Sequence, residues 1–288
     1  MKGEAATVAS LLHDASARIA AALGLEKREA RLEARVLAAH AWQVDRTWLI
    51  AHDTDPLGDP QVTIFQSLLA RRLVGEPVAY ILGEKEFYGR MFKVTPDVLI
   101  PRPETELLVE TALKCLPNER PVRILDIGTG SGCIALSLAL ERPDCSVTAV
   151  DLSARALTIA QENARRLHTQ VQLLQSNLFD SLGDARFNLI ISNPPYIPAS
   201  DPHLRQGDVR FEPKLALTAG PEGLDTLKPL VQTAPNHLVS GGWLMLEHGW
   251  DQQDSCHSLL VESGFMKVQC LLDLAGHGRL TLGQWMGR

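Results

Sequence analysis

The second half of the chain alternates continuous apolar runs with stretches of helical composition. From Val122 onward the runs read VRILDI, SVTAVD, VQLLQ and FNLIIS. One helical stretch begins near Ser131, between the first two runs, and a second ends near Leu167, between the next two. Such alternation predicts βαβ units and a parallel sheet. Because the apolar residues are consecutive rather than alternate, both faces of the sheet should be covered by helices. The sequence therefore predicts an α/β domain.

The predicted sheet continues towards the end of the chain. A proline-rich loop from Asn193 to about Pro221 is followed by a helix, the strand WLMLEH and another helix. Two β-like runs, 266–272 and 280–285, come last. Two such runs so close together predict an antiparallel hairpin that closes the sheet.

The first part of the chain has the apolar spacing of helices. Three stretches have the composition and apolar spacing of amphipathic helices, namely Val8–Leu23, Arg28–Trp42 and Pro60–Leu73. Pro60 suits a first helical turn, and Gly75 suits the residue after a helix end. We predict a small helical domain over residues 1–76.

A short segment separates the two predicted domains. From Tyr80 to Ile100 aromatic and β-branched residues are broken by glycine and proline, a pattern typical of short strands in a hairpin. The predicted division is a helical domain at 1–76, a β-hairpin linker at 77–105 and the α/β domain at 106–288.

Composition narrows the function classes. The formal charge of −6 disfavours broad contact with nucleic-acid phosphates, although local basic patches remain open. The five cysteines have no C-x-x-C spacing and the nine histidines no H-x-x-x-H spacing, so neither predicts a metal site. The start of the chain lacks the apolar region of a signal peptide, and no run of about 18 apolar residues occurs. We expect a cytoplasmic protein.

A glycine-rich segment, Asp126–Gly132, stands at the end of the first predicted strand and opens a helix. Glycines there let the backbone approach a ligand closely, and the helix start offers unpaired N–H groups. Asp151 ends the second strand, where its carboxylate can accept hydrogen bonds from both hydroxyls of a ribose. The alternative interpretation is a plain turn with Asp151 as a helix cap.

The spacing of these glycines favours one nucleoside-type cofactor over another. The dinucleotide pattern G-x-G-x-x-G needs a glycine where this chain has Cys133. The observed spacing, with Gly128, Gly130 and Gly132, suits the methyl donor S-adenosyl-L-methionine better than a dinucleotide.

The tetrapeptide Asn193-Pro194-Pro195-Tyr196 directly follows the strand FNLIIS. Ligands of open α/β sheets bind at this carboxyl edge. The Asn193 side-chain oxygen and the Pro194 carbonyl can accept from a substrate NH2 group, and the Tyr196 ring can lie over a planar substrate. A plain turn is the alternative for this motif alone, but its place after a buried strand predicts methylation of a planar amide or amine nitrogen.

Taken together, these motifs resemble the HemK/PrmC family of release-factor glutamine methyltransferases. The resemblance covers nearly the whole chain, including the helical domain. Asn-Pro-Pro-Tyr is shared with adenine methyltransferases, so the combination carries the assignment. It rests on Asp126–Gly132, Asp151, Asn193–Tyr196, PRPETE at 101–106, GDVRFEP at 207–213 and GEPVAYILG at 75–83.

The resemblance implies a fold and an activity. The fold is a Rossmann-like class I methyltransferase sheet, seven-stranded and mostly parallel with a C-terminal hairpin, beside a small all-helical N-terminal domain. The activity is methylation of the side-chain nitrogen (N5) of the glutamine in the Gly-Gly-Gln motif of bacterial class I peptide chain release factors, which modulates translation termination. S-adenosyl-L-homocysteine is the second product.

The resemblance also assigns residues. The expected catalytic residues are Asn193, Pro194 and Tyr196, which with Pro195 hold the glutamine amide. Asn177 stands where family members often have Asp, which puts donor affinity in doubt. The donor site is expected to comprise Gly128, Thr129, Gly130, Ser131, Gly132, Asp151, Asn177, Phe179 and Asn193.

Two charged segments are further candidates for substrate binding. Arg102, Glu104 and Glu106 belong to the PRPETE run and are expected either to close over the site or to form a solvated loop. Arg210 and Glu212 follow the catalytic strand, where substrate loops gather, and could instead pair with one another.

Two other functions compete with glutamine methylation. An enzyme that methylates the exocyclic amine of adenine in DNA or RNA would use the same tetrapeptide on a flipped base. The acidic charge and the lack of an evident basic recognition domain disfavour it. A module that binds the donor without catalysis predicts a damaged tetrapeptide, whereas here it is intact.

Overall fold

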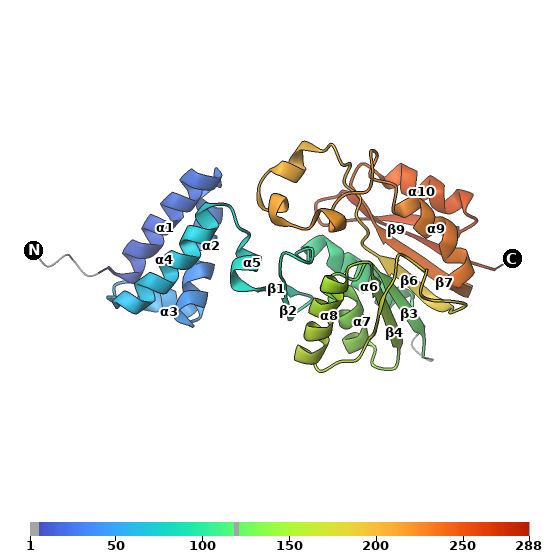
Figure 1. Ribbon diagram of the computed structural model, residues 1–288, viewed down its shortest axis with the longest axis horizontal. Coiled ribbons are helices and arrows are strands. Elements are labelled where there is room, and N and C mark those ends of the chain that lie inside the picture. Colours follow the sequence, from blue (N-terminus) through green and yellow to red (C-terminus); the bar gives the residue numbers. More distant parts are fainter. Residues whose placement is uncertain (1–5, 118–120, 288) are drawn as a thin grey trace, which may run out of the picture. The chain divides into compact units, whose positions relative to one another are not determined.

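The computed structural model describes residues 6–117 and 121–287. Residues 1–5, 118–120 and 288, which the predicted domain ranges include, lie outside the described residues. The contacts divide the chain into two units. A helical unit comprises residues 1–83 and 203–211, and an α/β unit comprises residues 84–202 and 212–288 (Figure 1).

The helical unit contains the three predicted helices and two that were missed. Asp45 caps one of the missed helices by accepting a hydrogen bond from Trp48 N at 2.7 Å. The other occupies the start of the predicted hairpin, between Pro77 and the left-handed Gly83. Both are too short for a periodic apolar pattern to appear. The helices are α1 (Val8–Leu23), α2 (Lys27–Trp42), α3 (Arg46–Ala51), α4 (Asp59–Leu73) and α5 (Val78–Leu82).

A buried arginine ties a distant segment of the chain to the helical unit. The guanidinium of Arg72 is 3% exposed and bonds both carboxylate oxygens of Glu33, at 2.8 and 2.9 Å. It also donates to Asp208 at 2.8 Å. Asp208 belongs to the 3-10 helix η3 (Asp208–Phe211), which follows η2 (Pro202–Arg205). Burial of the shared cation explains why residues 203–211 group with α2 and α4.

The α/β unit begins with a short hairpin and continues into one large sheet. Tyr88 and Gly89, both at positive φ, form the turn of the hairpin. In the large sheet the strand order is β5-β4-β3-β6-β7-β9-β8. The strands are β1 (Glu84–Phe87), β2 (Arg90–Lys93), β3 (Arg123–Ile127), β4 (Ser146–Asp151), β5 (Gln172–Gln175), β6 (Phe187–Ser192), β7 (Leu238–Glu247), β8 (Met266–Leu272) and β9 (Gly278–Trp285).

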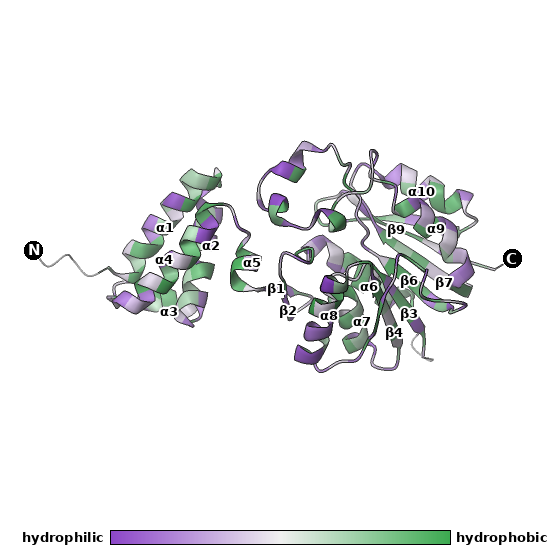
Figure 2. Ribbon diagram, viewed as in Figure 1, coloured by the Kyte–Doolittle hydropathy of each residue, from purple (hydrophilic) through white to green (hydrophobic). Residues whose placement is uncertain are grey.

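The sheet confirms the predicted fold class. Its strands β3 to β7 are parallel, and β8 and β9 form the antiparallel hairpin. Helices cover both faces: α6, α7 and α8 pack on one, and α9 and α10 on the other (Figure 1). α7 is hydrophobic over most of its length, whereas α8 is hydrophobic on one side (Figure 2). The bounds are α6 (Glu106–Cys115), α7 (Cys133–Glu141), α8 (Ala154–Arg166), α9 (Leu227–Thr233) and α10 (Gln253–Glu262), with η1 (Pro103–Thr105), η4 (Lys214–Ala216) and η5 (Ala234–His237).

The register of the central strands determines where the motifs meet. Ile127, the last residue of β3, pairs with Val150 of β4 on one side and with Ser192 of β6 on the other. The carboxyl ends of β3, β4 and β6 therefore lie together at one end of the sheet, where the strand order also reverses. Such a reversal is the usual ligand site of open α/β sheets. In the described ranges, no helix is both long and apolar enough to cross a membrane.

Candidate active site

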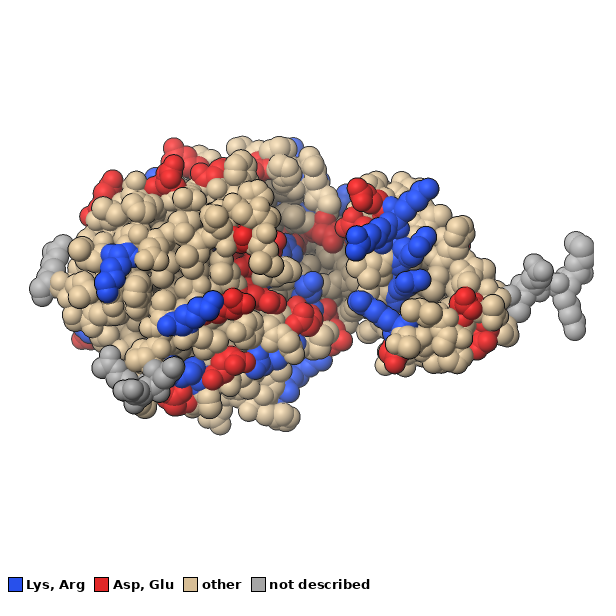
Figure 3. Space-filling view, turned by 180° about the vertical axis from the view of Figure 1, so that it is seen from behind, with Lys and Arg blue, Asp and Glu red and all other residues tan. Residues whose placement is uncertain are grey.

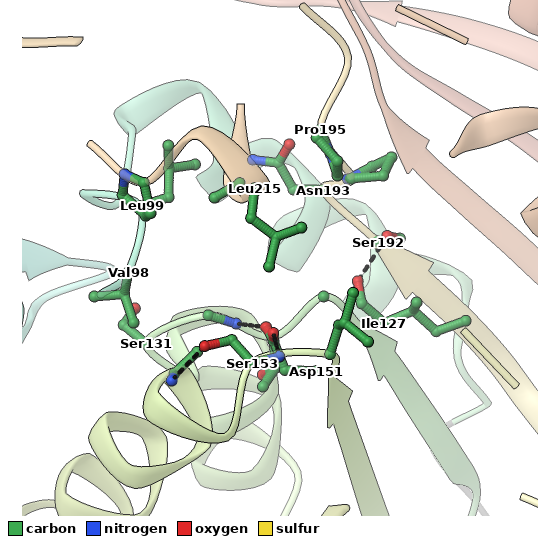
Figure 4. A pocket seen from close by; sticks show the side chains of 18 of the residues that line it. Val98, Leu99, Ile127, Ser131, Asp151, Ser153, Ser192, Asn193, Pro195 and Leu215 are labelled. Atoms are coloured by element: carbon green, nitrogen blue, oxygen red, sulfur yellow. Dashed lines mark hydrogen bonds between the residues drawn. The ribbon is translucent and has the colours of Figure 1, made fainter. Parts of the chain in front are cut away.

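A cavity of about 210 Å³ opens at this end of the sheet, within the α/β unit. Asp151, Ser131 and Ser153 lie on one side of it and Asn193 and Pro195 on the other (Figure 4). Ten of the residues expected from the sequence line the cavity: Arg102, Gly128, Thr129, Gly130, Ser131, Asp151, Asn177, Asn193, Pro194 and Pro195.

The glycine loop after β3 leaves space for a ligand. Gly128 and Gly130 have φ values of +74° and +55°, which side chains rarely adopt. A Cβ added at either would meet no described atom within 4 Å. At Gly132 an added Cβ would instead lie 3.2 Å from Ala160 Cβ. The first two glycines thus form an open cradle for a closely bound molecule, while Gly132 lets α7 approach α8.

Asp151 holds this loop in position. One of its carboxylate oxygens accepts from Gly130 N at 2.8 Å, and the other accepts from Ser153 N at 2.8 Å. The cap of α8 is Ser153, whose hydroxyl accepts from Ala156 N at 3.2 Å. Asp151 is therefore not the helix cap of the alternative interpretation. Burial raises its pKa, and its oxygens retain lone pairs that can accept from ribose hydroxyls.

A second carboxyl group lies beneath the loop. Asp126 is fully buried and accepts a hydrogen bond from the Thr129 hydroxyl at 2.7 Å through Oδ2. Its Oδ1 has no hydrogen-bond partner among the described residues. Burial raises the pKa of Asp126 to about 7. A cationic ligand in the cradle would favour the charged form of this group.

The Asn-Pro-Pro segment forms the facing wall. Asn193 Nδ2 donates to Thr105 Oγ1 at 3.2 Å, which ties the segment to η1. Ser192 donates its hydroxyl to the Ile127 carbonyl at 2.7 Å, linking the ends of β6 and β3 (Figure 4). The donor cradle and the polar groups of Asn193 and Pro194 therefore flank one cavity.

Tyr196 lies outside the lining of this cavity. Its hydroxyl donates to Glu247 Oε1 at 3.4 Å, and its carbonyl accepts from Gln252 Nε2 at 3.0 Å. Burial raises the pKa of Tyr196. In this structure the ring therefore packs against the buried core and does not face the cavity.

Besides Gly132, four other expected residues also lie away from the lining. Glu104 is exposed on η1, and the Phe179 ring stacks on His237 in the core with centroids 4.7 Å apart. Arg210 belongs to the helical unit, where it donates to the Val74 carbonyl at 2.8 Å. Glu212 forms an ion pair with Arg102. Arg210 and Glu212 thus each have another partner, in contrast to the pairing considered from the sequence.

Several lining residues were missed by sequence reasoning. Val98, Leu99 and Leu215 supply apolar surface, and Leu215 projects into the middle of the cavity (Figure 4). Val98 and Leu99 come from a loop and Leu215 from the three-residue helix η4, and neither kind of segment carries a periodic pattern. Thr105 and Glu247 are buried beside the Asn-Pro-Pro wall. Glu247 could have been identified from the sequence, because it ends β7, the strand next to β6. Over residues 6–117 and 121–287, no group of three or more His, Cys, Asp or Glu is placed to hold a metal ion.

The fold and the site define a class I, Rossmann-like methyltransferase. Residues 104–206 match the methyltransferase small domain, and residues 10–83 match the PrmC N-terminal domain. A solved methyltransferase from Pyrococcus furiosus has the same fold, with a TM-score of 0.54 at 20% identity, covering 77% of this chain and 100% of that one.

Closer relatives identify the family. The release factor glutamine methyltransferase of Bordetella pertussis is 50% identical over 88% of this chain and 94% of its own length. That of Neisseria gonorrhoeae is 47% identical over 92% of this chain and 96% of its own length. The chain therefore belongs to the release factor glutamine methyltransferase family, which confirms the resemblance found in the sequence.

The buried Asp126 predicts a pH-dependent stability. Because its pKa is raised to about 7, the folded protein binds this proton more tightly than the unfolded chain does. The resulting stability is fully present below about pH 4, the pKa of an unfolded Asp, and is lost as the pH rises towards 7. In urea unfolding, the stability of Asp126→Asn relative to the wild type should therefore rise between about pH 4 and about pH 7 and stay constant at higher pH. Parallel pH profiles would contradict the assignment, and Glu247, present in both proteins, cancels in the comparison.

Proposed function

We propose that the protein transfers a methyl group from S-adenosyl-L-methionine to the side-chain amide nitrogen (N5) of the glutamine in the Gly-Gly-Gln motif of bacterial class I peptide chain release factors. The observation that carries this proposal is the β4-β3-β6 register, which brings the glycine cradle and the Asn193-Pro194 wall to one cavity. The reaction would modulate translation termination. We place it in the cytoplasm, because release factors work on ribosomes there.

The residues around the cradle fit the donor. Gly128, Thr129, Gly130 and Ser131 would follow its amino-acid part, and Asp151 would accept from the ribose hydroxyls. Asn177 lines the cavity and can accept from the adenine amino group through its carbonyl oxygen. When bound, S-adenosyl-L-methionine supplies an electrophilic methyl group on a positively charged sulfur. Gly132 and Phe179 would act indirectly, through helix and core packing.

The facing wall would hold the substrate amide. The Asn193 side-chain oxygen and the Pro194 carbonyl would each accept one hydrogen of the glutamine NH2 group, and Pro195 would keep this backbone rigid. Asn193 would also border the donor. Tyr196 would support the wall through its bond to Glu247. We retain Arg102, Glu104 and Arg210 as candidates for outer contacts with the release factor, whereas the buried Glu212 would act by holding Arg102.

These residues act mainly by orientation. The two carbonyl-type acceptors would hold the glutamine nitrogen so that its lone pair faces the donor methyl group in line with the breaking bond. Holding reactants in such a geometry can contribute several kcal/mol to lowering the barrier, on the order of 7. The nitrogen would gain the methyl group as the bond between the methyl carbon and sulfur breaks, which leaves S-adenosyl-L-homocysteine, and the nitrogen would lose one proton to solvent.

The deciding experiment measures transfer of labelled methyl from S-adenosyl-L-methionine to a purified, unmethylated class I release factor. We expect label on the wild-type factor and none on a factor whose Gly-Gly-Gln glutamine is replaced by Ala. Adenine-containing DNA is tested in parallel, because the same wall could accept from an adenine amine. Label on DNA alone would reject the glutamine proposal in favour of adenine methylation.

The open cradle predicts the effect of adding one methyl group. In Gly130→Ala the new Cβ would occupy space needed by the donor, so the Kd for S-adenosyl-L-homocysteine should rise at least about tenfold in calorimetry. Gly24→Ala is a matched control, because Gly24 has φ +67° and no described atom within 4 Å of an added Cβ but caps α1 in the helical unit. Equal affinity in both variants would contradict the cradle.

We further propose that the helical domain, predicted at 1–76, binds the release factor, while 77–105 links it to the catalytic domain at 106–288. The helical unit presents many Lys and Arg side chains on one face (Figure 3). On α2, Lys27, Arg28 and Arg31 are exposed and follow helical spacing. An acidic surface of a protein partner would complement them.

Charge reversal on α2 tests this role. The double variant Arg28→Glu/Arg31→Glu should raise the KM for the intact release factor at least about fivefold, with greater loss at low salt. The Kd for S-adenosyl-L-homocysteine should stay unchanged, because the donor cradle lies in the α/β unit. An unchanged KM would count against recognition by this face, and equal losses of both affinities would indicate misfolding instead.

A further inference from the structure

A buried carboxylate lies directly behind the substrate wall. Glu247 ends β7, and its preceding residue Leu246 pairs with Ser192, so Glu247 stands beside Asn193 at the sheet edge. It is 3% exposed. Its Oε1 accepts from the Tyr196 hydroxyl at 3.4 Å, and its Oε2 has no hydrogen-bond partner within the described chain. Burying a carboxylate with so few hydrogen-bond partners lowers the stability of the fold, which points to a functional role for Glu247.

Thr105 is bonded to the substrate wall and lies beside this carboxylate. Its side chain is buried, and its Oγ1 accepts from Asn193 Nδ2 at 3.2 Å. Among the described residues, no hydrogen bond of ordinary geometry joins this hydroxyl to Glu247. The hydroxyl nevertheless lowers the pKa of Glu247, which burial raises to about 7, and Glu247 Oε2 is free to accept its hydrogen. A hydroxyl has one hydrogen to donate. If that hydrogen points to Glu247, the oxygen can only accept from Asn193.

We propose that Glu247 is a positioning residue, which acts through Thr105 to hold the Asn193 amide with Nδ2 turned inward and Oδ1 turned towards the substrate. This inference deepens the proposed function and rests on it, since it assumes that Asn193 accepts from a substrate NH2 group. The charge of Glu247 takes the Thr105 hydrogen. Thr105 then offers Asn193 only lone pairs, and the amide orientation follows.

The orientation matters because the two ends of an asparagine amide have nearly the same shape but opposite hydrogen-bonding roles. With Oδ1 outward, Asn193 accepts from the substrate amide. With Nδ2 outward, two NH2 groups would face each other and the substrate nitrogen would lose its alignment. Packing alone does not distinguish these states, so a charged group that fixes the direction of one hydroxyl is required.

Replacement of Glu247 by a neutral residue of the same shape tests the inference. In Glu247→Gln the amide can donate to Thr105, which frees the Thr105 hydrogen to turn the Asn193 amide round. We expect kcat for methylation of the release factor to fall at least about fiftyfold. The KM for the factor and the Kd for S-adenosyl-L-homocysteine should stay within about twofold. Thr105→Val should cause the same loss, and Thr105→Ser, which keeps the hydroxyl, should restore most of the rate.

The double variant separates positioning from general structural damage. If both residues act along one path, Thr105→Val/Glu247→Gln should be no slower than Thr105→Val alone. Multiplied losses would overturn the inference, as would a Glu247→Gln protein with wild-type kcat. A wild type unable to methylate the factor would overturn the proposed function together with it, so the two failures are distinguishable.

The pH dependence of kcat provides a second test, because a purely structural role of Glu247 would not affect it. Since the charged form of Glu247 is required, kcat of the wild type at saturating donor should fall as the pH drops below about 7. This acid limb should be absent in Glu247→Gln. Four other groups act on Glu247 from neighbouring elements: Arg279 on β9, Glu104 on η1, Tyr196 after β6 and Cys133 on α7. All four are retained in the variant, and an unchanged limb would overturn the assignment.

Discussion

The parallel pairing of β3 with β4 and β6 is the constraint on which the rest of the site depends. Because Ile127 pairs with both Val150 and Ser192, the chain leaves all three strands at the same level. The glycine loop, the carboxylate of Asp151 and the Asn-Pro-Pro wall therefore meet at the carboxyl ends of these strands. A slip of one residue in either pair would turn these groups to the wrong face.

Around this frame, the protein keeps two carboxyl groups in a nearly dry environment. Asp126 lies beneath the glycine loop and Glu247 behind the substrate wall, and burial raises the pKa of each to about 7. Such groups cost stability. Their arrangement suits a site that accepts a cationic donor on one side and must orient a neutral amide on the other. The loss of stability thus falls on groups beside the donor and the substrate, where the direction of hydrogen bonds affects reactivity.

Most of the fold was predictable, because long elements repeat their pattern. Buried strands gave continuous apolar runs, and the long helices gave three- and four-residue spacing. The short helices α3 and α5 escaped, since five or six residues carry no period. The site was predicted in part. Asp151 and Asn193 line the cavity as expected, whereas the side chains of Tyr196 and Phe179 turn elsewhere, to Glu247 and His237.

By itself, the sequence determined the order of strands and helices, the glycine cradle and the Asn-Pro-Pro-Tyr segment, and through their combination the family. These are local features, since each depends on residues close together in the chain. Only the tertiary structure decided which side chains face the cavity and which support it. The proposed link from Asn193 through Thr105 to Glu247 joins three elements distant in sequence. No local pattern encodes such a contact, because it arises when the packed sheet brings their ends together.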